Sequence, residues 1–303
     1  MNLLEKFEAV TVQADQRITP SDKEFCEKHQ AAYEAAIQSF RELSCFWEDM
    51  VARQKELLEE PNSDDKSERC MEYLSSHSGL EISTEKINFH IERLHKRFIG
   101  KIVDHFNSTY KVSASSSNIC NNLLPKEPDC RRWDNEEEYK EYHAQLQTLI
   151  VRYQDVVDQL ILFLDGRSFS QQAFYELAQE CHKAAWNLYQ KKPDYEQKKN
   201  VIRFIGYFCS TSSWSRYVEW ELESKMKDIL RGIAHFETGS YQVYPYGFSE
   251  LLGYGRRSEN EQVFSTCSKV TSLKMFKNGR VDVKFTTEDN ASEFAENYLG
   301  LVA

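Results

Sequence analysis

The chain of 303 residues lacks the short motifs by which common enzyme classes are recognised. It contains no G-x-x-x-x-G-K-[ST], G-x-G-x-x-G, H-E-x-x-H or G-x-S-x-G sequence, the patterns that place phosphate-binding glycines, zinc-binding histidines or a nucleophilic serine. Its eight cysteines form no C-x-x-C pair and are spaced widely, whereas zinc ligands have short spacings. We therefore predict no catalytic residue, no metal site and no cofactor.

The sequence also lacks long apolar runs. None approaches the ~20 residues that a membrane-spanning helix needs, and Met1–Glu5 lacks the basic start and apolar core of a signal peptide. Without export, the cysteines are expected to be reduced and mostly buried. We expect a cytoplasmic protein with no membrane partner.

Basic residues are in deficit, since 38 Lys and Arg face 48 Asp and Glu, for a formal net charge of −10. Such a chain repels nucleic acid on average, so a DNA contact would need a local basic patch. An acidic surface could instead compete with DNA for a basic partner. The content of 41% hydrophobic and 13% aromatic residues is ample for a packed core and argues against disorder.

Apolar residues recur at helical spacing along most of the chain. In 84–107, for example, Ile87, Ile91, Leu94, Phe98 and Ile102 form one stripe. Loops are predicted where polar residues and prolines gather, and the stretch 111–132 is the longest of them. We predict an N-terminal helical domain (1–112), a polar linker loop (113–132) and a C-terminal domain (133–303). Helices are predicted over 21–60, 84–107, 134–164, 170–191, 214–235 and 288–299.

The C-terminal part departs from this helical pattern. Asn278-Gly279 separates two β-prone runs, which predicts a hairpin with a type I′ turn at about 268–286. The run 201–208 is consistent with a strand or a buried helical turn, and its length favours the strand. The predicted fold is mostly α (α+β): long amphipathic helices with a small C-terminal cap of a β-hairpin and a helix. The long stripes favour an extended molecule that self-associates.

Three stretches carry a family resemblance. Phe276-Lys277-Asn278-Gly279, the segment from Trp220 to Phe236, and the segment from Phe89 to Val112 resemble the hairpin, the preceding helix and the central helix of a helical family carried by phages and mobile elements. The size and layout also resemble phage inhibitors of the Gabija anti-phage complex. The resemblance implies a non-enzymatic inhibitor in the host bacterial cytoplasm, which binds the Gabija nuclease–helicase assembly and blocks its DNA binding or cleavage.

A glycine-interrupted aromatic segment, 241–257, is the predicted partner-binding site. Tyr and Arg are enriched at interface hot spots because they bury much area and keep a polar end. Glycines would let such a loop adapt to a partner, although the same residues could equally pack onto the protein's own helices. The candidate residues are Tyr241, Tyr244, Tyr246, Phe248, Tyr254, Arg256 and Arg257.

Two alternative functions remain open on sequence grounds. Asp282 and Lys284 alternate on one strand face, as in metal nucleases of the D-x-K kind, but no further acidic ligand is apparent. Lys96, Arg97 and Lys101 lie on one predicted helix and could make the chain a DNA-binding accessory protein of a mobile element. A solvated charged face explains either pattern more simply.

Overall fold

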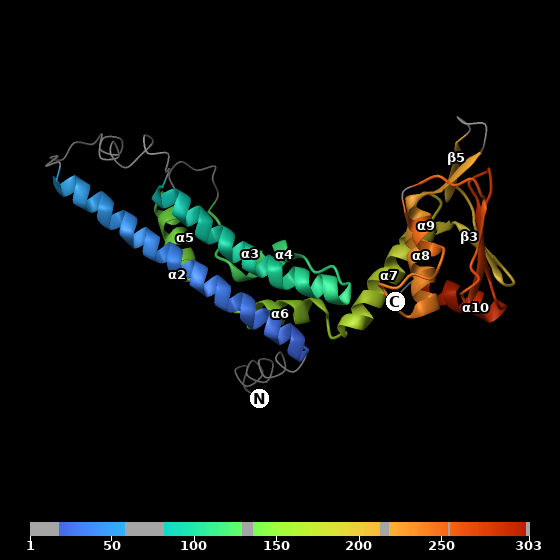
Figure 1. Cartoon of the computed structure of the whole chain (residues 1–303), viewed down its shortest axis with the longest axis horizontal. Helices are drawn as coiled ribbons and strands as arrows, with labels where there is room; N and C mark the ends of the chain where they lie inside the picture. Colours follow the sequence, from blue (N-terminus) through green and yellow to red (C-terminus); the bar gives the residue numbers. More distant parts are fainter. Residues whose placement is uncertain (1–17, 58–81, 129–135, 213–217, 254, 301–303) are drawn as a thin grey trace. The chain divides into compact units, whose positions relative to one another are not determined.

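The computed structural model describes residues 18–57, 82–128, 136–212, 218–253 and 255–300, which divide into two compact units at Gly166 and Arg167. Helices dominate the described residues, and all of the strands lie in the second unit (Figure 1). The predicted α+β class therefore holds at this level. The division differs from the predicted one at 113–132, because α4 (Ser116–Leu123) occupies that stretch and buries Ile119 and Cys120.

Unit 1 is built on two long helices, α2 (Pro20–Leu57) and α3 (Thr84–Tyr110). Four residues of the predicted α3 stripe, Ile87, Ile91, Phe98 and Ile102, are buried, whereas Leu94 is only partly buried. Ser83 caps the helix through its side chain. The two helices are antiparallel, since Tyr33 stacks on Phe98 whereas Phe40 stacks on His90, earlier in α3. Helices α5 (Glu136–Thr148) and α6 (Tyr153–Phe163) complete the unit.

The single helix predicted over 134–164 is interrupted at residues 149–152, and side chains of α2 explain the break. Arg41 donates to the carbonyls of Gln147 and Leu149, and Gln30 donates to that of Val151. The carbonyls thus obtain hydrogen bonds from another helix in place of the next helical turn.

Buried polar side chains also join the helices of unit 1. His95 is fully buried, with one ring nitrogen 2.7 Å from the Tyr33 hydroxyl and the other 2.9 Å from the Leu146 carbonyl. Asp22, also buried, accepts hydrogen bonds from Thr19, His105 and Tyr110. Desolvation by burial opposes ionisation of Asp22, but these hydrogen bonds outweigh it and lower its pKa.

Unit 2 begins with α7 (Phe169–Ala185), which ends before the predicted limit of 191 because Trp186 starts a short hairpin, β1 (Trp186–Asn187) and β2 (Lys192–Pro193). The run 201–208 contains a strand, β4 (Val201–Phe204). The predicted helix 214–235 is wrong in its first half, because β6 (Glu219–Leu222) pairs with β5 (Cys209–Ser212) and α8 starts only at Ser224 and runs to Thr238. Residues 213–217 lie outside the described part.

A five-stranded antiparallel sheet organises unit 2, in the order β3-β4-β9-β8-β7. The expectation of a small two-stranded cap is therefore corrected: β8 and β9 are neighbours inside a larger sheet. Helices α8 and α10 lie on one side of it (Figure 1). The remaining elements are β3 (Tyr195–Lys198), α9 (Phe248–Leu252), β7 (Glu261–Val263), β8 (Val270–Met275), β9 (Val281–Phe285), α10 (Glu288–Phe294) and a π-helical turn, Ala295–Leu299.

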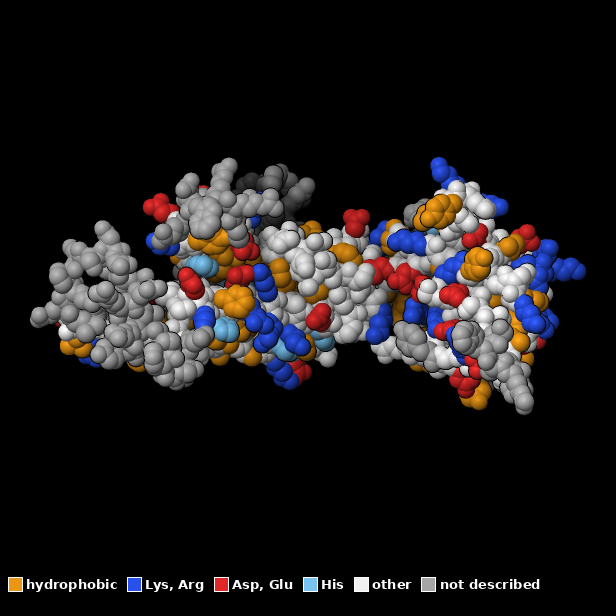
Figure 2. Space-filling model, turned by 90° about the horizontal axis from the view of Figure 1, so that it is seen from above, with side chains coloured by type: hydrophobic (Ala, Val, Ile, Leu, Met, Phe, Trp, Pro, Cys, Tyr) orange, Lys and Arg blue, Asp and Glu red, His pale blue; other side chains and the backbone are white. Residues whose placement is uncertain are grey.

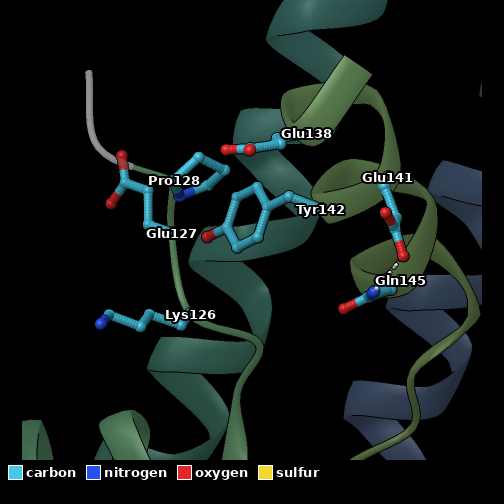
Figure 3. A pocket seen from close by; sticks show the side chains of 7 residues that line it. All are labelled: Lys126, Glu127, Pro128, Glu138, Glu141, Tyr142 and Gln145. Carbon is cyan, nitrogen blue, oxygen red and sulfur yellow. Dashed lines mark hydrogen bonds between the residues drawn. The ribbon is translucent and has the colours of Figure 1, made fainter. Parts of the chain in front are cut away.

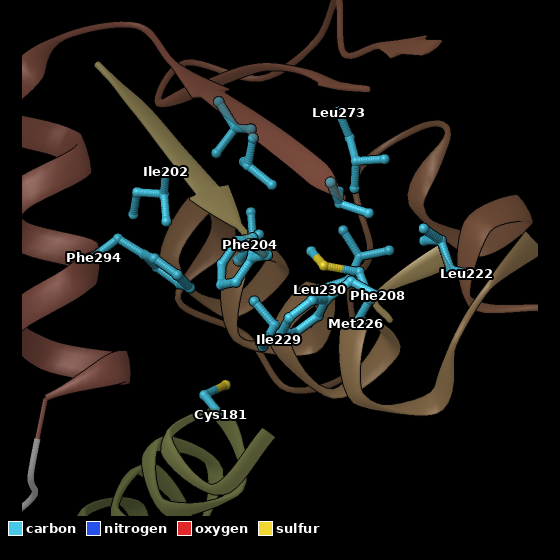
Figure 4. Packing of buried hydrophobic residues seen from close by; sticks show 14 of the residues in the cluster. Cys181, Ile202, Phe204, Phe208, Leu222, Met226, Ile229, Leu230, Leu273 and Phe294 are labelled. Atoms are coloured by element: carbon cyan, nitrogen blue, oxygen red, sulfur yellow. The ribbon is translucent and has the colours of Figure 1, made fainter. Parts of the chain in front are cut away.

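The core of unit 2 lies between this sheet and α8. Ile202, Phe204 and Leu273 of the sheet meet Met226 and Ile229 of α8 (Figure 4). On β4 and β9 every second residue is buried, as expected for strands covered on one face. The other face of the sheet is left without a helical cover in the described part of the chain.

The turn between β8 and β9 differs from the predicted type I′. Gly279 has φ +82°, but Asn278 is not among the described residues with positive φ. The Gly279 N–H donates to the Phe276 carbonyl, and the Phe276 N–H donates to that of Arg280. This is a three-residue loop in which only the glycine is left-handed.

Among the described cysteines, Cys26, Cys120, Cys181 and Cys209 are buried free thiols, whereas Cys45 is exposed. Burial raises the pKa of the Cys26 thiol to about 12. Cys70 and Cys130 lie outside the described residues. No helix in the described ranges is long and apolar enough to cross a membrane.

Candidate functional site

The predicted binding segment starts where α8 ends, at Gly239, whose φ of +67° closes the helix. Tyr241 folds back onto that helix: its ring centroid is 4.3 Å from that of His235, and its hydroxyl donates to the Ser170 carbonyl. Burial raises the pKa of Tyr241. This tyrosine is therefore largely a packing residue of unit 2.

Phe248 is the clearest correction to the predicted site. It is fully buried at the start of α9, with its ring 4.3 Å from that of Phe264. Gly247 precedes it with φ +88° and turns the chain inward. Phe248 is a core residue and is removed from the candidate surface.

The two arginines of the segment bind other residues of unit 2. Arg257 exchanges both backbone hydrogen bonds with Trp220, and its guanidinium donates to Gln262. Arg256 is half-exposed and lies 3.6 Å from Glu219 and 3.8 Å from Glu221. Tyr254 lies outside the described residues.

Two predicted residues remain as exposed aromatics: Tyr246, with 74% of its surface exposed, and Tyr244, with 39%. Val243 beside them is also exposed. We name these three residues the tyrosine loop. Exposed aromatic side chains in a short segment are typical of interaction sites, because their transfer from water into a protein interface is favourable.

A second exposed apolar group in unit 2 was missed by the sequence reasoning. Tyr189 is 100% exposed, Leu188 81% and Tyr207 83%, with Ile205 also exposed. We name these four residues the hairpin-tip surface. The sequence pattern does not indicate these exposed residues. It predicts one continuous helix over 170–191 and one element over 201–208, so no exposed turn is expected at 188 or 207.

Asp194 joins the two parts of the hairpin-tip surface. Its N–H donates to the Ala185 carbonyl ahead of β1, and its own carbonyl accepts the Ile205 N–H. Its carboxylate accepts from Asn187 and lies 4.0 Å from Lys225. Lys225 also lies over the Phe208 ring at 3.8 Å. Hydrogen bonds of Asp194 thus connect the start of the β1–β2 hairpin with the residue that follows β4.

Asp282, the metal ligand that the sequence suggested, lies between two arginine side chains. Asp282 lies 3.3 Å from Arg203 and 3.1 Å from Arg280, so two guanidinium groups already neutralise its carboxylate. No group of three or more His, Cys, Asp or Glu side chains suited to a metal occurs within the described ranges. The Asp282 environment resembles an ion-pair network rather than a divalent-metal site, which needs several oxygen ligands.

In unit 1 the basic candidates are on α3, where Lys96 pairs with Glu92 one turn earlier. A hydrogen bond from Lys96 to Glu92 raises the pKa of this lysine. Arg97 and Lys101 are exposed on the same helix. Because Glu92 and Lys96 neutralise each other, the predicted basic stripe is weaker than the sequence suggests.

An open cleft of about 670 Å³ lies beside α5 (Figure 3). Tyr142 stands at its wall, and burial raises the pKa of this tyrosine. The lining combines one lysine, three glutamates, a glutamine and a proline without a nucleophile or a base beside one. We assign it no chemistry. The lining residues are Lys126, Glu127, Pro128, Glu138, Glu141, Tyr142 and Gln145.

Comparison of the chain with protein-family models, with curated proteins and with solved structures finds no match in any of the three. The functional argument therefore rests on the residues and their surroundings. The strongest feature is the exposed apolar surface of unit 2.

Proposed function

We propose that the chain acts by binding another protein and carries out no chemistry of its own. The observation that carries this proposal is the exposure of Leu188, Tyr189 and Tyr207 on unit 2, each more than four-fifths exposed. Leu188 and Tyr189 are neighbours in the turn between β1 and β2, and Tyr207 follows β4. Groups of exposed apolar side chains mark binding sites more often than single ones do. Tyrosine is among the residues that contribute most to binding energy.

The tyrosine loop supports the same function. Tyr244 and Tyr246 keep the exposure that the sequence-based prediction required, and they belong to a loop whose neighbours Tyr241 and Phe248 are anchored in unit 2. An anchored loop loses less conformational entropy on binding than a free one. Residues that neighbour both surfaces are thus held by contacts within unit 2.

The partner in this proposal is a bacterial anti-phage defence complex, and the Gabija nuclease–helicase assembly is the specific candidate. This choice rests on the family resemblance of the sequence alone. Inhibition would follow from occupation of a surface that the assembly needs for DNA binding or cleavage. The chain would act in the host bacterial cytoplasm, where that assembly works.

A binding experiment with the full chain and purified Gabija subunits tests the proposal. We expect the unaltered chain to bind, and we expect Leu188→Ala with Tyr189→Ala to weaken the complex by roughly 2–4 kcal/mol, or about 30- to 1,000-fold in Kd. Tyr244→Ala with Tyr246→Ala tests the second surface in the same assay.

The matched control is Leu162→Ala, which removes a similarly exposed apolar side chain from α6 of unit 1, outside both candidate surfaces. It should leave Kd within twofold, and all variants should melt as the parent does. No binding to the assembly would refute the partner. Binding that tolerates both double variants would refute the two surfaces as the interface. DNA cleavage by the isolated chain in the presence of Mg²⁺ would refute the absence of chemistry.

Self-association belongs to the same proposal. Phe46, Leu57 and Phe89 of unit 1 are exposed large apolar residues, and two copies could cover them. A mass of two or more chains in light scattering is the expected result, lowered to one chain by Phe46→Asp with Phe89→Asp. A mass equal to one chain for the parent at micromolar concentration would rule out a stable oligomer.

A further inference from the structure

The five-stranded sheet of unit 2 has one face that the helices leave uncovered. On β4 and β9, residues such as Ile202 and Val283 are buried toward the helices. Their neighbours Arg203, Asp282 and Lys284 therefore stand on the opposite face, because successive side chains of a strand alternate. Residues of α8 and α10 belong to the same core as these buried strand residues, so both helices cover the same face of the sheet.

Strand register brings charged residues together on this open face. Arg203 is paired with Asp282, which is paired with Lys274 on β8. The adjacent row contains Lys198, Val201, Lys284 and Ser272. Figure 2 shows Lys and Arg side chains along the end of unit 2 that bears the sheet. The charged residues of the face are Glu196, Lys198, Arg203, Glu261, Lys274, Arg280, Asp282 and Lys284.

Positive charge exceeds negative charge on this face, by five cations to three carboxylates. Each carboxylate is already paired: Glu196 with Lys198 at 3.6 Å, and Glu261 with Lys274 at 2.8 Å. Asp282 lies between Arg203 and Arg280. Lys284 is exposed and has no ion pair among the described residues.

Two further lysines lie at the ends of the central strands. Lys199 is in the β3–β4 turn, and Lys277 is in the β8–β9 turn. Because β4 and β9 are adjacent and antiparallel, these turns lie at opposite ends of the sheet. Cations therefore run along the full length of the open face.

We propose that this open sheet face binds the phosphodiester backbone of nucleic acid. Protein interfaces are depleted in lysine and centred on large apolar anchors, whereas the apolar side chains at the strand positions of this face are Val201 and Val263. Interfaces with nucleic acid are more polar and much more positive. An open antiparallel sheet is also a surface on which proteins hold single strands.

The negative charge of the whole chain does not act against this assignment. Unit 1 contains 20 Lys and Arg against 31 Asp and Glu, a net −11, whereas unit 2 contains 18 against 17, a net +1. Beyond about 10 Å, exposed charges are largely screened at 0.1 M salt. The sheet face therefore presents its own local charge to a ligand.

Fluorescence anisotropy with a labelled 20-nucleotide single strand and the full chain tests the proposal. If five phosphates are neutralised, log K should fall with log[salt] at a slope of about −3.5, which is a loss of roughly 100-fold between 50 and 200 mM salt. A duplex of the same sequence is the second arm, and it separates single-stranded from double-stranded ligands.

The variants assign the binding to the face. Lys198→Glu with Lys284→Glu should weaken binding at least tenfold, and Lys284→Gln should lower the salt slope by about 0.7. The control is Lys183→Glu, an exposed residue of α7 in the same unit, which should change Kd less than twofold. Melting temperatures are measured for each variant.

Several results would overturn the assignment. One is that neither oligonucleotide binds at 50 mM salt. Another is that Lys183→Glu raises Kd as much as the sheet variants do. A third is that a folded Lys284→Gln chain keeps the parent's slope of log K against log[salt]. Competition by poly-glutamate as effective as competition by DNA would replace nucleic acid by an acidic protein as the ligand. The outcome is independent of the Gabija experiment, since the hairpin-tip surface and the tyrosine loop are other residues.

Discussion

Replacing Gly279 with alanine should destabilise unit 2 more than its small size suggests. Gly279 has φ +82°, and a Cβ added there would lie 2.5 Å from the Gly206 carbonyl oxygen and 3.4 Å from Tyr207 Cα. Its own carbonyl accepts hydrogen bonds from the Phe208 and Cys209 N–H groups. The β8–β9 turn is thus pressed against the chain that follows β4.

Two costs add at this position. A left-handed conformation costs a residue with a Cβ about 1–2 kcal/mol. The overlap with a backbone oxygen is relieved only if the turn moves away from Gly206, which weakens the two hydrogen bonds to Phe208 and Cys209 at roughly 0.5–1.5 kcal/mol each. We expect a total loss of about 3–4 kcal/mol for Gly279→Ala, a large part of the 5–15 kcal/mol that stabilises a typical domain.

Gly239→Ala is the matched control in the same unit. Gly239 has φ +67°, but a Cβ there would meet nothing within 4 Å, so only the conformational cost of about 1–2 kcal/mol remains. The difference between the two variants isolates the close approach of the turn to Gly206.

The free energy of unfolding is measured by urea titration, and amide hydrogen exchange at Phe208 and Cys209 reports the local contact. Exchange at these two amides should rise in Gly279→Ala and stay unchanged in Gly239→Ala. Equal losses of stability in both variants would refute the close-approach argument, and an unchanged midpoint for Gly279→Ala would refute the positive φ as well.

Three further outcomes are expected. The lowered pKa of Asp22 means that its contribution to unit 1 is present above the unfolded pKa of about 3.9 and is lost as pH falls through the folded value; acid titration of the parent should show this loss, and Asp22→Asn should remove it. Gly232→Ala should lower the melting temperature of unit 2, because its Cβ would overlap Cys181 Sγ, and adding Cys181→Ala should recover part of the loss, whereas strict additivity would contradict the contact. Phe248→Ala should cost about 3–5 kcal/mol on urea unfolding, and a cost under 1 kcal/mol would show that this residue is not in the core.

The candidate surface shows where sequence reasoning succeeded and where it stopped. Aromatic density made 241–257 the candidate segment, but it did not distinguish exposed Tyr246 from buried Phe248, two residues away. Both are aromatic residues in a glycine-interrupted segment, and only the inward turn at Gly247 separates them. Leu188 and Tyr189 were missed because α7 ends earlier than its apolar spacing suggests.

Strand pairing was the largest gap in the predicted fold. Glu219–Leu222 has an alternating pattern that also fits the start of a helix, and its pairing with β5 decided its conformation. Such pairing joins residues far apart in the chain, so local propensity does not reveal it. The same holds for β4, whose partner β9 lies about eighty residues further along the chain.

By itself the sequence determined the long helices α2 and α3. Their apolar residues recur every three or four positions, and only a helix places residues with that spacing on one face. It also determined that apolar and charged side chains alternate along residues 281–285, and that Gly279 has the positive φ that other residues avoid. The tertiary structure alone decided the break at 149–152, the five-stranded sheet and the uncovered basic face. These features arise from contacts between distant segments, in which a side chain such as Arg41 or a neighbouring strand supplies the hydrogen bonds that local structure would otherwise make.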